Sequence, residues 1–164
     1  MSNGITYSGE LRRKIIHLSS SIFALLLIVY GWNNIITPMV IFTFSFIILD
    51  YIRIYNLSIN KVYKLIFDDV TRNKEQNKLT GASYVLIGIT LTILLFDENA
   101  AVNGILYLSF GDTSAALIGR KYGKTFIGNK TLEGSFAFFI TCLIVSNLLT
   151  PTSLIVAIIA SCFA

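Results

Sequence analysis

The chain has 164 residues, of which 54% are hydrophobic and 13% charged, and its mean hydropathy is +0.71. Soluble domains are typically about a quarter charged, so this composition excludes an ordinary soluble domain and predicts an integral membrane protein. The formal net charge of +4 is modest. We therefore expect no nucleic-acid partner, and the positions of the charges are more informative than their sum.

Six apolar runs follow one another along the chain, separated by short polar turns and two longer polar stretches. The runs cover about 15–30, 35–54, 81–96, 100–119, 131–149 and 152–164. A membrane-spanning helix needs about 20 residues, so the third run is marginal and the sixth is short. We predict an all-α, polytopic helical bundle of about six transmembrane segments that forms a single domain over 1–164.

The two longer polar stretches, 55–80 and 120–130, carry many of the cations. If residues 12–14 face the cytoplasm, alternating spans place all 13 lysines and arginines on the cytoplasmic side. The positive-inside rule therefore predicts a cytoplasmic N-terminus and two cytoplasmic loops, in a protein of the cell inner membrane.

The first of these loops contains a helical pattern. Apolar residues recur at spacings of three and four, and they are Ile59, Val62, Tyr63, Ile66 and Phe67. This spacing predicts an amphipathic helix that either lies in the inner membrane interface or caps the bundle through the same face.

Residues 109–134 combine charge and glycine in an otherwise apolar sequence. They include Asp112 within an apolar run, the second acid Glu133, several glycines and four cations, namely Arg120, Lys121, Lys124 and Lys130. Lysine and arginine bind phosphate oxygens, and glycine lets the backbone approach a ligand closely. Mg²⁺ is commonly held by one or two carboxylates together with substrate phosphates. The segment predicts a nucleotide site at the membrane surface.

Asp112 is an ionisable residue within a predicted membrane helix, a position that is costly and usually functional. Ala116, Gly119 and Gly123 follow it on one helix face. This small-residue face either approaches the nucleotide phosphates or forms a packing groove for another helix.

The start of the fifth apolar run has features of a phosphate-binding helix terminus. Thr131 is a predicted N-cap, and the free N–H groups at a helix start bind phosphate, to which Lys130 adds positive charge. Glu133 either contacts a metal ion or the substrate, or simply favours the helix dipole from the first turn.

Two further groups of charged residues lie at predicted inner helix ends. Arg13, Lys14 and His17 share one helix face. Arg12, Arg13 and Lys14 are explained by membrane topology and anionic lipid, or Arg13 and Lys14 hold the substrate with His17, which follows them on their face and is a candidate for contact with the substrate's phosphate or hydroxyl group. Asp50 and Arg53 are expected to pair across one turn and to close the inner end of their helix.

Four segments together carry a resemblance to a known family. They are Glu-Leu-Arg-Arg-Lys-Ile-Ile-His at 10–17, Leu-Thr-Gly-Ala-Ser-Tyr at 79–84, the Gly-Asp…Gly-Arg…Gly-Lys pattern of 111–124, and Lys-Thr-Leu-Glu-Gly-Ser at 130–135. In this order they resemble the CTP-dependent lipid-alcohol kinases, which include dolichol, phytol and farnesol kinases and the CTP-dependent diacylglycerol kinase. The same core pattern resembles phosphatidate cytidylyltransferase, but the short length and the Arg-Lys-x-x-His start favour the kinase.

The resemblance implies that CTP and Mg²⁺ are used and that Arg13, Lys14, Asp112 and Gly119 are needed for activity. We expect transfer of the γ-phosphoryl group of CTP to a membrane lipid alcohol. The catalytic candidates are Asp112, Lys130, Glu133 and His17, with Asp112 and Glu133 as metal contacts. The phosphate-binding candidates are Arg13, Lys14, Gly119, Arg120, Lys121, Gly123, Lys124 and Thr131.

Several points stay open at this stage. A small transporter or channel with Asp112 in its path is the distant alternative to an enzyme. The family resembled here usually continues beyond a point like Ala164, so we expect either a truncated form or a partner that completes the last helix. The sequence leaves open which lipid alcohol is used and whether the chain forms a homo-oligomer.

Overall fold

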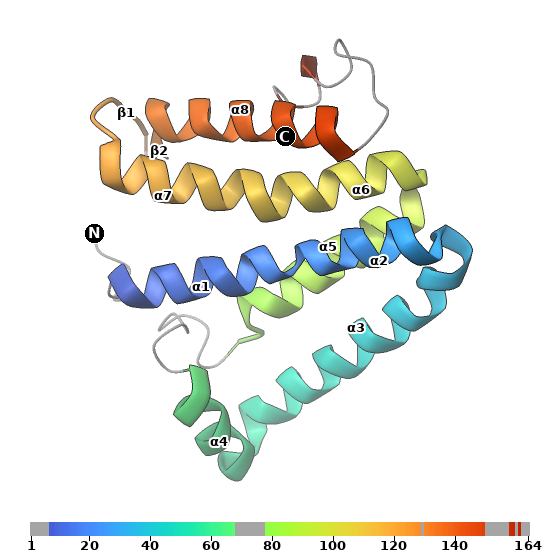
Figure 1. The fold of residues 1–164 in the computed structure, drawn as a ribbon. Coiled ribbons are helices and arrows are strands. Elements are labelled where there is room, and N and C mark those ends of the chain that lie inside the picture. The colour runs from blue at the N-terminus through green and yellow to red at the C-terminus, as the bar shows by residue number, and fades with distance from the viewer. Residues whose placement is uncertain (1–6, 68–77, 129, 150–157, 160, 162–164) are drawn as a thin grey trace.

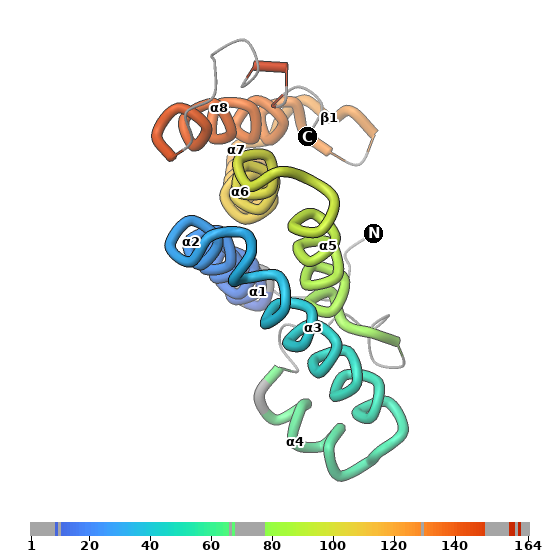
Figure 2. The backbone as a smooth tube through the Cα atoms, turned by 90° about the vertical axis from the view of Figure 1, so that its right-hand side faces the viewer, coloured from blue at the N-terminus to red at the C-terminus, as the bar shows by residue number. Residues whose placement is uncertain are grey.

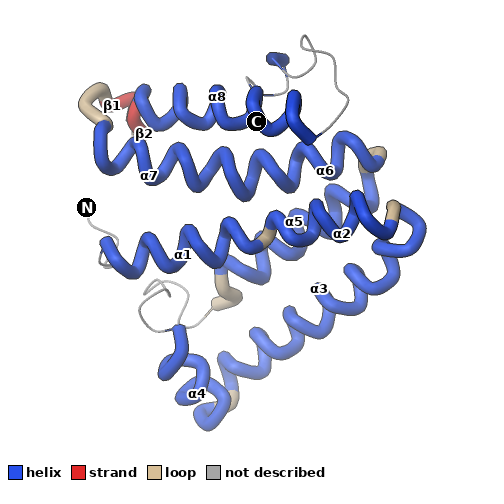
Figure 3. The backbone as a smooth tube through the Cα atoms, viewed as in Figure 1, coloured by secondary structure: helices blue, strands red, loops and turns tan. Residues whose placement is uncertain are grey.

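The structure, a computed structural model, describes residues 7–67, 78–128, 130–149, 158–159 and 161. Within these ranges the chain is almost entirely helical (Figures 1 and 3). The elements are α1 (Tyr7–Ser19), α2 (Ser21–Tyr30), α3 (Trp32–Tyr55), α4 (Leu57–Phe67), α5 (Gly81–Leu95), α6 (Glu98–Leu106), the π-helical turn η2 (Tyr107–Gly111), α7 (Asp112–Tyr122), β1 (Phe126–Ile127), β2 (Lys130–Thr131) and α8 (Leu132–Leu149).

The helices form a bundle in which consecutive segments run up and down. α6, η2 and α7 follow one another as a single long rod that lies against α8, and α1 and α2 lie on the other side of this rod (Figures 1 and 2). α5 packs between α6 and α3, and α4 is attached to the end of α3, away from α8. The start of α1, the end of α7, the β1–β2 hairpin and α4 all lie at one end of the bundle, on the left in Figure 1.

The predicted membrane character is confirmed. Among the described residues, three helical segments are long and apolar enough to cross a membrane, namely Leu11–Tyr30, Trp32–Tyr55 and Leu132–Leu149. α5 is a shorter apolar helix of 15 residues, as its marginal run indicated. Most of the predicted sixth segment, 152–164, lies outside the described residues. The fold is an all-α membrane bundle.

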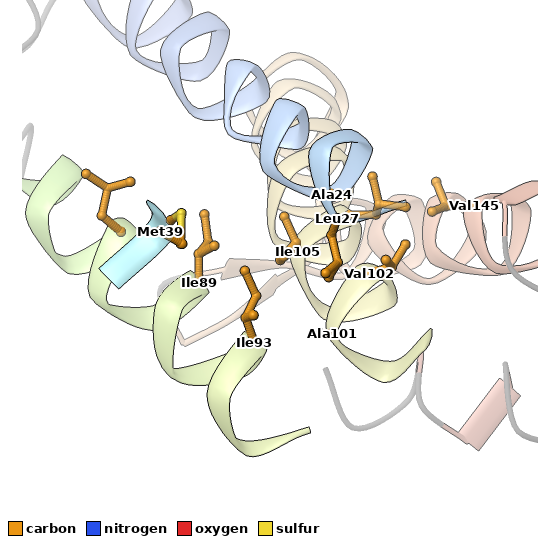
Figure 4. Close-up of a cluster of buried hydrophobic side chains, with 11 residues drawn as sticks. Ala24, Leu27, Met39, Ile89, Ile93, Ala101, Val102, Ile105 and Val145 are labelled. Carbon is orange, nitrogen blue, oxygen red and sulfur yellow. The ribbon is translucent and has the colours of Figure 1, made fainter. Parts of the chain in front are cut away.

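A buried apolar cluster holds α2, α3, α5, α6 and α8 together (Figure 4). α2 contributes Ala24 and Leu27, and both are fully buried. They meet side chains from α3, α5, α6 and α8, including Met39, Ile89, Ile93, Val102, Ile105 and Val145. Because lipid tails are as apolar as these side chains, close packing rather than water exclusion holds such helices together.

Two predicted turns differ in the structure. The turn expected over 31–34 is reduced to Gly31, whose φ of 74° is easily reached only by glycine, and α3 starts at once with Trp32. The Trp32 indole donates a 2.7 Å hydrogen bond to the Ile93 carbonyl, which ties this helix start to α5. The predicted loop 120–130 contains the end of α7 and a short antiparallel hairpin, β1–β2.

The predicted pairing of Asp50 with Arg53 is confirmed, with 2.9 Å between Arg53 Nε and Asp50 Oδ1. Asp50 also accepts hydrogen bonds from Thr80 and Ser83 at the start of α5. Arg53 lies 4.4 Å from the ring centroid of Tyr63 in α4. The pair therefore joins the neighbouring ends of α3, α4 and α5.

The predicted amphipathic helix is present as α4. Tyr63 faces the bundle through its contact with Arg53, whereas Leu57, Val62 and Leu65 are largely exposed. Both earlier interpretations thus retain support: one side of α4 contacts the bundle, and another presents apolar side chains outward. Its placement in the membrane interface stays a prediction.

Candidate active site

Three predicted site residues meet between α1 and α7. Lys14 Nζ lies 2.5 Å from Asp112 Oδ2, although the two residues are 98 positions apart in the sequence. His17 Nε2 lies 4.0 Å from the same carboxylate oxygen. The Lys14 side chain is 9% exposed and that of Asp112 is 47% exposed. The carboxylate is therefore held by a buried cation yet remains open to a ligand.

Two nitrogen atoms on the same face of α1 have no hydrogen-bond partner among the residues that the structure describes. They are Arg13 Nη1 and His17 Nδ1, and both atoms are buried. Buried polar atoms are normally paired, so each such atom calls for an explanation. Here the two nitrogens belong to residues next to Lys14 on α1, which pairs with Asp112. We interpret them as contacts for a ligand with several oxygen atoms.

A second group of predicted residues surrounds the β1–β2 hairpin. The Glu133 carboxylate accepts hydrogen bonds of 3.1 Å from the backbone N–H groups of Lys124 and Thr125. Glu133 thus connects the loop after α7 to the start of α8. This contact adds to the expected effect of an acid in the first turn on the helix dipole. A metal role for Glu133 stays a prediction.

Thr131 has the predicted capping role. Its hydroxyl accepts a 3.3 Å hydrogen bond from the N–H of Gly134, in the first turn of α8. This is the geometry by which a threonine N-cap satisfies a free donor at a helix start. The Lys130 side chain at the same corner is exposed.

The predicted small-residue face of α7 packs against the start of α8. A Cβ atom added to Gly119 would lie 2.7 Å from Thr131 Oγ1, and one added to Gly134 would lie 2.8 Å from the Ala115 carbonyl. A Cβ on Gly123 would lie 2.5 Å from Thr131 Cγ2. The packing interpretation therefore applies to these glycines. Phosphate binding by Gly119 and Gly123 stays a prediction.

The remaining cations lie at the exposed end of α7 and in the hairpin. Arg120, Lys121 and Lys124 are exposed, and Lys121 Nζ lies 5.2 Å from the ring centroid of Tyr122. Arg120 follows Asp112 by eight residues, which corresponds to about 12 Å along a helix. The cations thus lie further along the same rod than the Lys14–Asp112 pair, toward its polar end.

Within the described ranges, no group of three or more His, Cys, Asp or Glu side chains is arranged to hold a metal ion. A Mg²⁺ site that uses one or two carboxylates plus phosphate oxygens does not need such a group. Asp112 is the acid that lies beside the cations of α1.

The sequence did not predict the partners of four buried hydroxyl residues. Thr80 and Ser83 bind Asp50, and Ser20 and Ser109 bind each other with 2.7 Å between their Oγ atoms. Ser and Thr in membrane helices commonly bond to their own backbone, so their sequence alone indicates no partner. Thr80 and Ser83 do fall within the segment 79–84 that carried part of the resemblance.

Comparison with known proteins matches no family model and no solved structure. Curated relatives do match. An uncharacterised protein of Rickettsia prowazekii is 35% identical over 87% of this chain and 71% of its own length. CTP-dependent diacylglycerol kinase 1 of Schizosaccharomyces pombe is 33% identical over 85% of this chain and 69% of its own length. The dolichol kinase of Saccharomyces cerevisiae is 34% identical over 61% of this chain but only 20% of its own length.

These relatives agree with the resemblance carried by the four sequence segments, and their names favour phosphoryl transfer over cytidylyl transfer. The matched region includes most of this chain, at an identity that indicates common descent rather than shared composition. The chain belongs to the family of CTP-dependent lipid kinases.

Proposed function

We propose that this protein transfers the γ-phosphoryl group of CTP to the hydroxyl of a membrane lipid alcohol, at the cytoplasmic face of the inner membrane. The observation that carries the proposal is the meeting of Lys14, His17 and Asp112 between α1 and α7. The names of the relatives support CTP as donor and diacylglycerol or a polyprenol as acceptor. Phytol and geranylgeraniol are further acceptors with the same chemistry, a single hydroxyl on long apolar chains.

In the proposed reaction the lipid hydroxyl oxygen forms a bond to the γ-phosphorus of CTP. The bond between that phosphorus and the oxygen bridging to the β-phosphate breaks, and CDP leaves. The hydroxyl proton passes to the Asp112 carboxylate or to His17. Catalysis of phosphoryl transfer depends mostly on positioning and on stabilising charge, and the protein here offers a carboxylate beside a buried ammonium.

The phosphates of CTP would be bound by cations of α1 and by cations at the end of α7 and in the hairpin. Arg13 Nη1 is a buried donor without a hydrogen-bond partner in the described part of the chain, and Lys14 provides a buried ammonium beside the carboxylate. Arg120, Lys121, Lys124 and Lys130 are exposed and would bind the rest of the triphosphate. Because Lys14 is bound to Asp112, we expect it to move toward phosphate when the nucleotide arrives.

Mg²⁺ fits this donor set, because the Asp112 carboxylate is half-exposed and Mg²⁺ is commonly held by one or two carboxylates together with phosphate oxygens. Asp112 would hold the ion, with Glu133 as the proposed second contact. When bound, the ion would neutralise charge on the phosphate oxygens. The Glu133 carboxylate is bonded to two backbone N–H groups, so its participation requires the hairpin to shift or the ion to bind outside these bonds.

The experiment supplies purified protein in lipid with Mg²⁺ and CTP labelled separately at the α- and γ-phosphates. The acceptor panel contains diacylglycerol, phytol, geranylgeraniol, a polyprenol and phosphatidate. Label from the γ-phosphate is expected in one lipid alcohol, and that lipid identifies the substrate. Label from the α-phosphate in phosphatidate, with release of pyrophosphate, would assign the protein to cytidylyl transfer instead.

Asp112→Asn is the variant that tests the site. It keeps the side-chain volume but removes the negative charge, so we expect the γ-label transfer to fall at least about 100-fold. Asp97→Asn is a suitable control, because Asp97 is an exposed N-cap at the start of α6. Normal transfer by Asp112→Asn would refute the proposed role of this carboxylate.

A further inference from the structure

The first membrane segment has a tightened turn where α1 meets α2. The Ser20 N–H donates to the His17 carbonyl, and the Phe23 N–H donates to the Ser20 carbonyl, each over 3.1 Å. Both bonds connect residues three apart, instead of the four of an α-helix. The Ser20 hydroxyl also donates to the His17 carbonyl, over 2.6 Å. The turn from His17 to Ser20 is therefore held by the Ser20 hydroxyl as well as by backbone hydrogen bonds.

The rod that carries Asp112 has the opposite irregularity. Residues Tyr107–Gly111 form a π-helical turn, in which hydrogen bonds connect residues five apart. The Thr113 hydroxyl donates to the Ser109 carbonyl over 2.6 Å. The extra residue in this turn changes the direction of all later side chains of the rod. Compared with an uninterrupted α-helix, they are rotated by about 100° around the rod axis. Asp112 is the first residue after this turn.

The two irregular turns are joined to each other. Ser20 Oγ and Ser109 Oγ are 2.7 Å apart, and both residues are buried. Ser20 lies three residues from His17, and Ser109 lies three residues from Asp112. The hydroxyl pair is thus one helical turn from the contacts between Lys14, His17 and Asp112, on both helices.

The other side of the π-helical turn is held by α8. The Tyr107 hydroxyl is hydrogen-bonded to the Ser146 hydroxyl. A Cβ atom added to Gly111 would lie 2.7 Å from the Phe138 ring and 3.0 Å from Cys142 Sγ. The end of the turn is therefore packed closely against α8, and Ser109 contacts Ser20 at the junction of α1 and α2.

We propose that Ser20 and Ser109 are a positioning pair, which sets the rotation and the register of α1 against α7 so that Lys14 and His17 face Asp112. Neither hydroxyl touches the reacting atoms. This inference rests on the proposed function for its catalytic consequence, but the geometry it asserts can be measured without any activity.

The first experiment measures γ-label transfer by the full chain in lipid for Ser20→Ala, Ser109→Ala and the double variant. Each single change is expected to lower kcat at least about tenfold, since a 1 Å misplacement can cost about 100-fold. The KM for CTP should stay within twofold. Because the two residues share one bond, the double variant should be no worse than the more affected of the two single variants.

Ser19→Ala is the matched control, because Ser19 donates to the Ile16 carbonyl over 2.6 Å, as Ser20 does to His17, but is exposed. It should behave like the unchanged protein. The proposal would be overturned if kcat of the double variant fell by the product of the two single losses, or if both single variants kept an unchanged kcat.

The second experiment needs no catalysis. In a background carrying Cys142→Ala and Cys162→Ala, Ser20→Cys combined with Ser109→Cys should form a disulfide under mild oxidation. Ser19→Cys combined with Ser109→Cys should not. Protection of both thiols from a maleimide reagent reads out the bond, and failure of the first pair to form it would overturn the proposed contact.

The positioning role is tested in the same way. With Lys14→Cys and Asp112→Cys, a short bifunctional thiol reagent should bridge α1 and α7, and adding Ser109→Ala should reduce the bridged fraction several-fold. An unchanged fraction would overturn the role of the pair. If the unchanged protein transferred no label to any lipid, the proposed function would fail while these cross-linking results still decided the inference.

Discussion

Removal of the Asp50 carboxylate tests how the polar ends of α3, α4 and α5 are held together. This carboxylate is 4% exposed and accepts hydrogen bonds from Arg53, from the N–H and hydroxyl of Thr80, and from the Ser83 hydroxyl. Arg53 is 2% exposed, so Asp50→Ala leaves a guanidinium buried beside an empty space.

Breaking a buried ion pair by removing one partner costs about 3–5 kcal/mol, because the remaining charge stays buried without its counter-ion. The donors of Thr80 and Ser83 lose their acceptor as well, which places the expected loss in the free energy of unfolding at the upper part of that range. The free energy of unfolding of a whole domain is about 5–15 kcal/mol, so the expected loss is a large share of the total stability. Titration with SDS in mixed micelles measures the change.

Two comparisons make the result specific. Asp97→Ala removes an exposed N-cap that accepts from the Ala100 N–H, and it should cost about 1 kcal/mol. Combining Asp50→Leu with Arg53→Met removes both charges and should be less destabilising than Asp50→Ala. A loss below about 1 kcal/mol for Asp50→Ala, equal to that of Asp97→Ala, would refute the view that this network is a buried structural anchor.

Three other substitutions test the remaining contacts. Gly119→Ala places a methyl group 2.7 Å from Thr131 Oγ1, so it should lower the free energy of unfolding by about 1–3 kcal/mol in the same titration, and unchanged stability would contradict the close packing of α7 on α8. Lys14→Met should lower kcat/KM for CTP about 100-fold, which corresponds to about 2.7 kcal/mol. Arg12 is exposed, and Arg12→Met should change kcat/KM less than about threefold. Equal losses in the two variants would argue against a specific role for Lys14. Glu133→Gln should raise the Mg²⁺ concentration for half-maximal transfer about tenfold if the proposed metal contact exists. An unchanged Mg²⁺ dependence would leave Glu133 with its hairpin contact alone.

The sequence by itself determined the class of protein and the order of its helices. Runs of apolar residues and the placement of lysine and arginine are local properties of the chain, and the bilayer acts on them directly because a backbone in lipid must satisfy its own hydrogen bonds. The i to i+3 pairing of Asp50 with Arg53 and the N-cap at Thr131 were predictable for the same reason, since helix geometry fixes which near neighbours meet. The candidate site residues Arg13, Lys14, His17 and Asp112 were predicted from a pattern of residue types rather than from any knowledge of their contacts, and their roles stay predictions.

Only the tertiary structure decided which of these groups meet. Lys14 and Asp112 are 98 positions apart, and nothing local to either residue specifies the other. The π-helical turn before Asp112 is equally invisible in the sequence, because a single inserted residue leaves hydropathy unchanged while rotating the rest of the helix by about 100°. Such a turn persists because the neighbouring helices supply its contacts, from Ser20 on one side and from Phe138 and Ser146 on the other. The direction in which a membrane helix presents its polar residues is thus set by the packing of its partners.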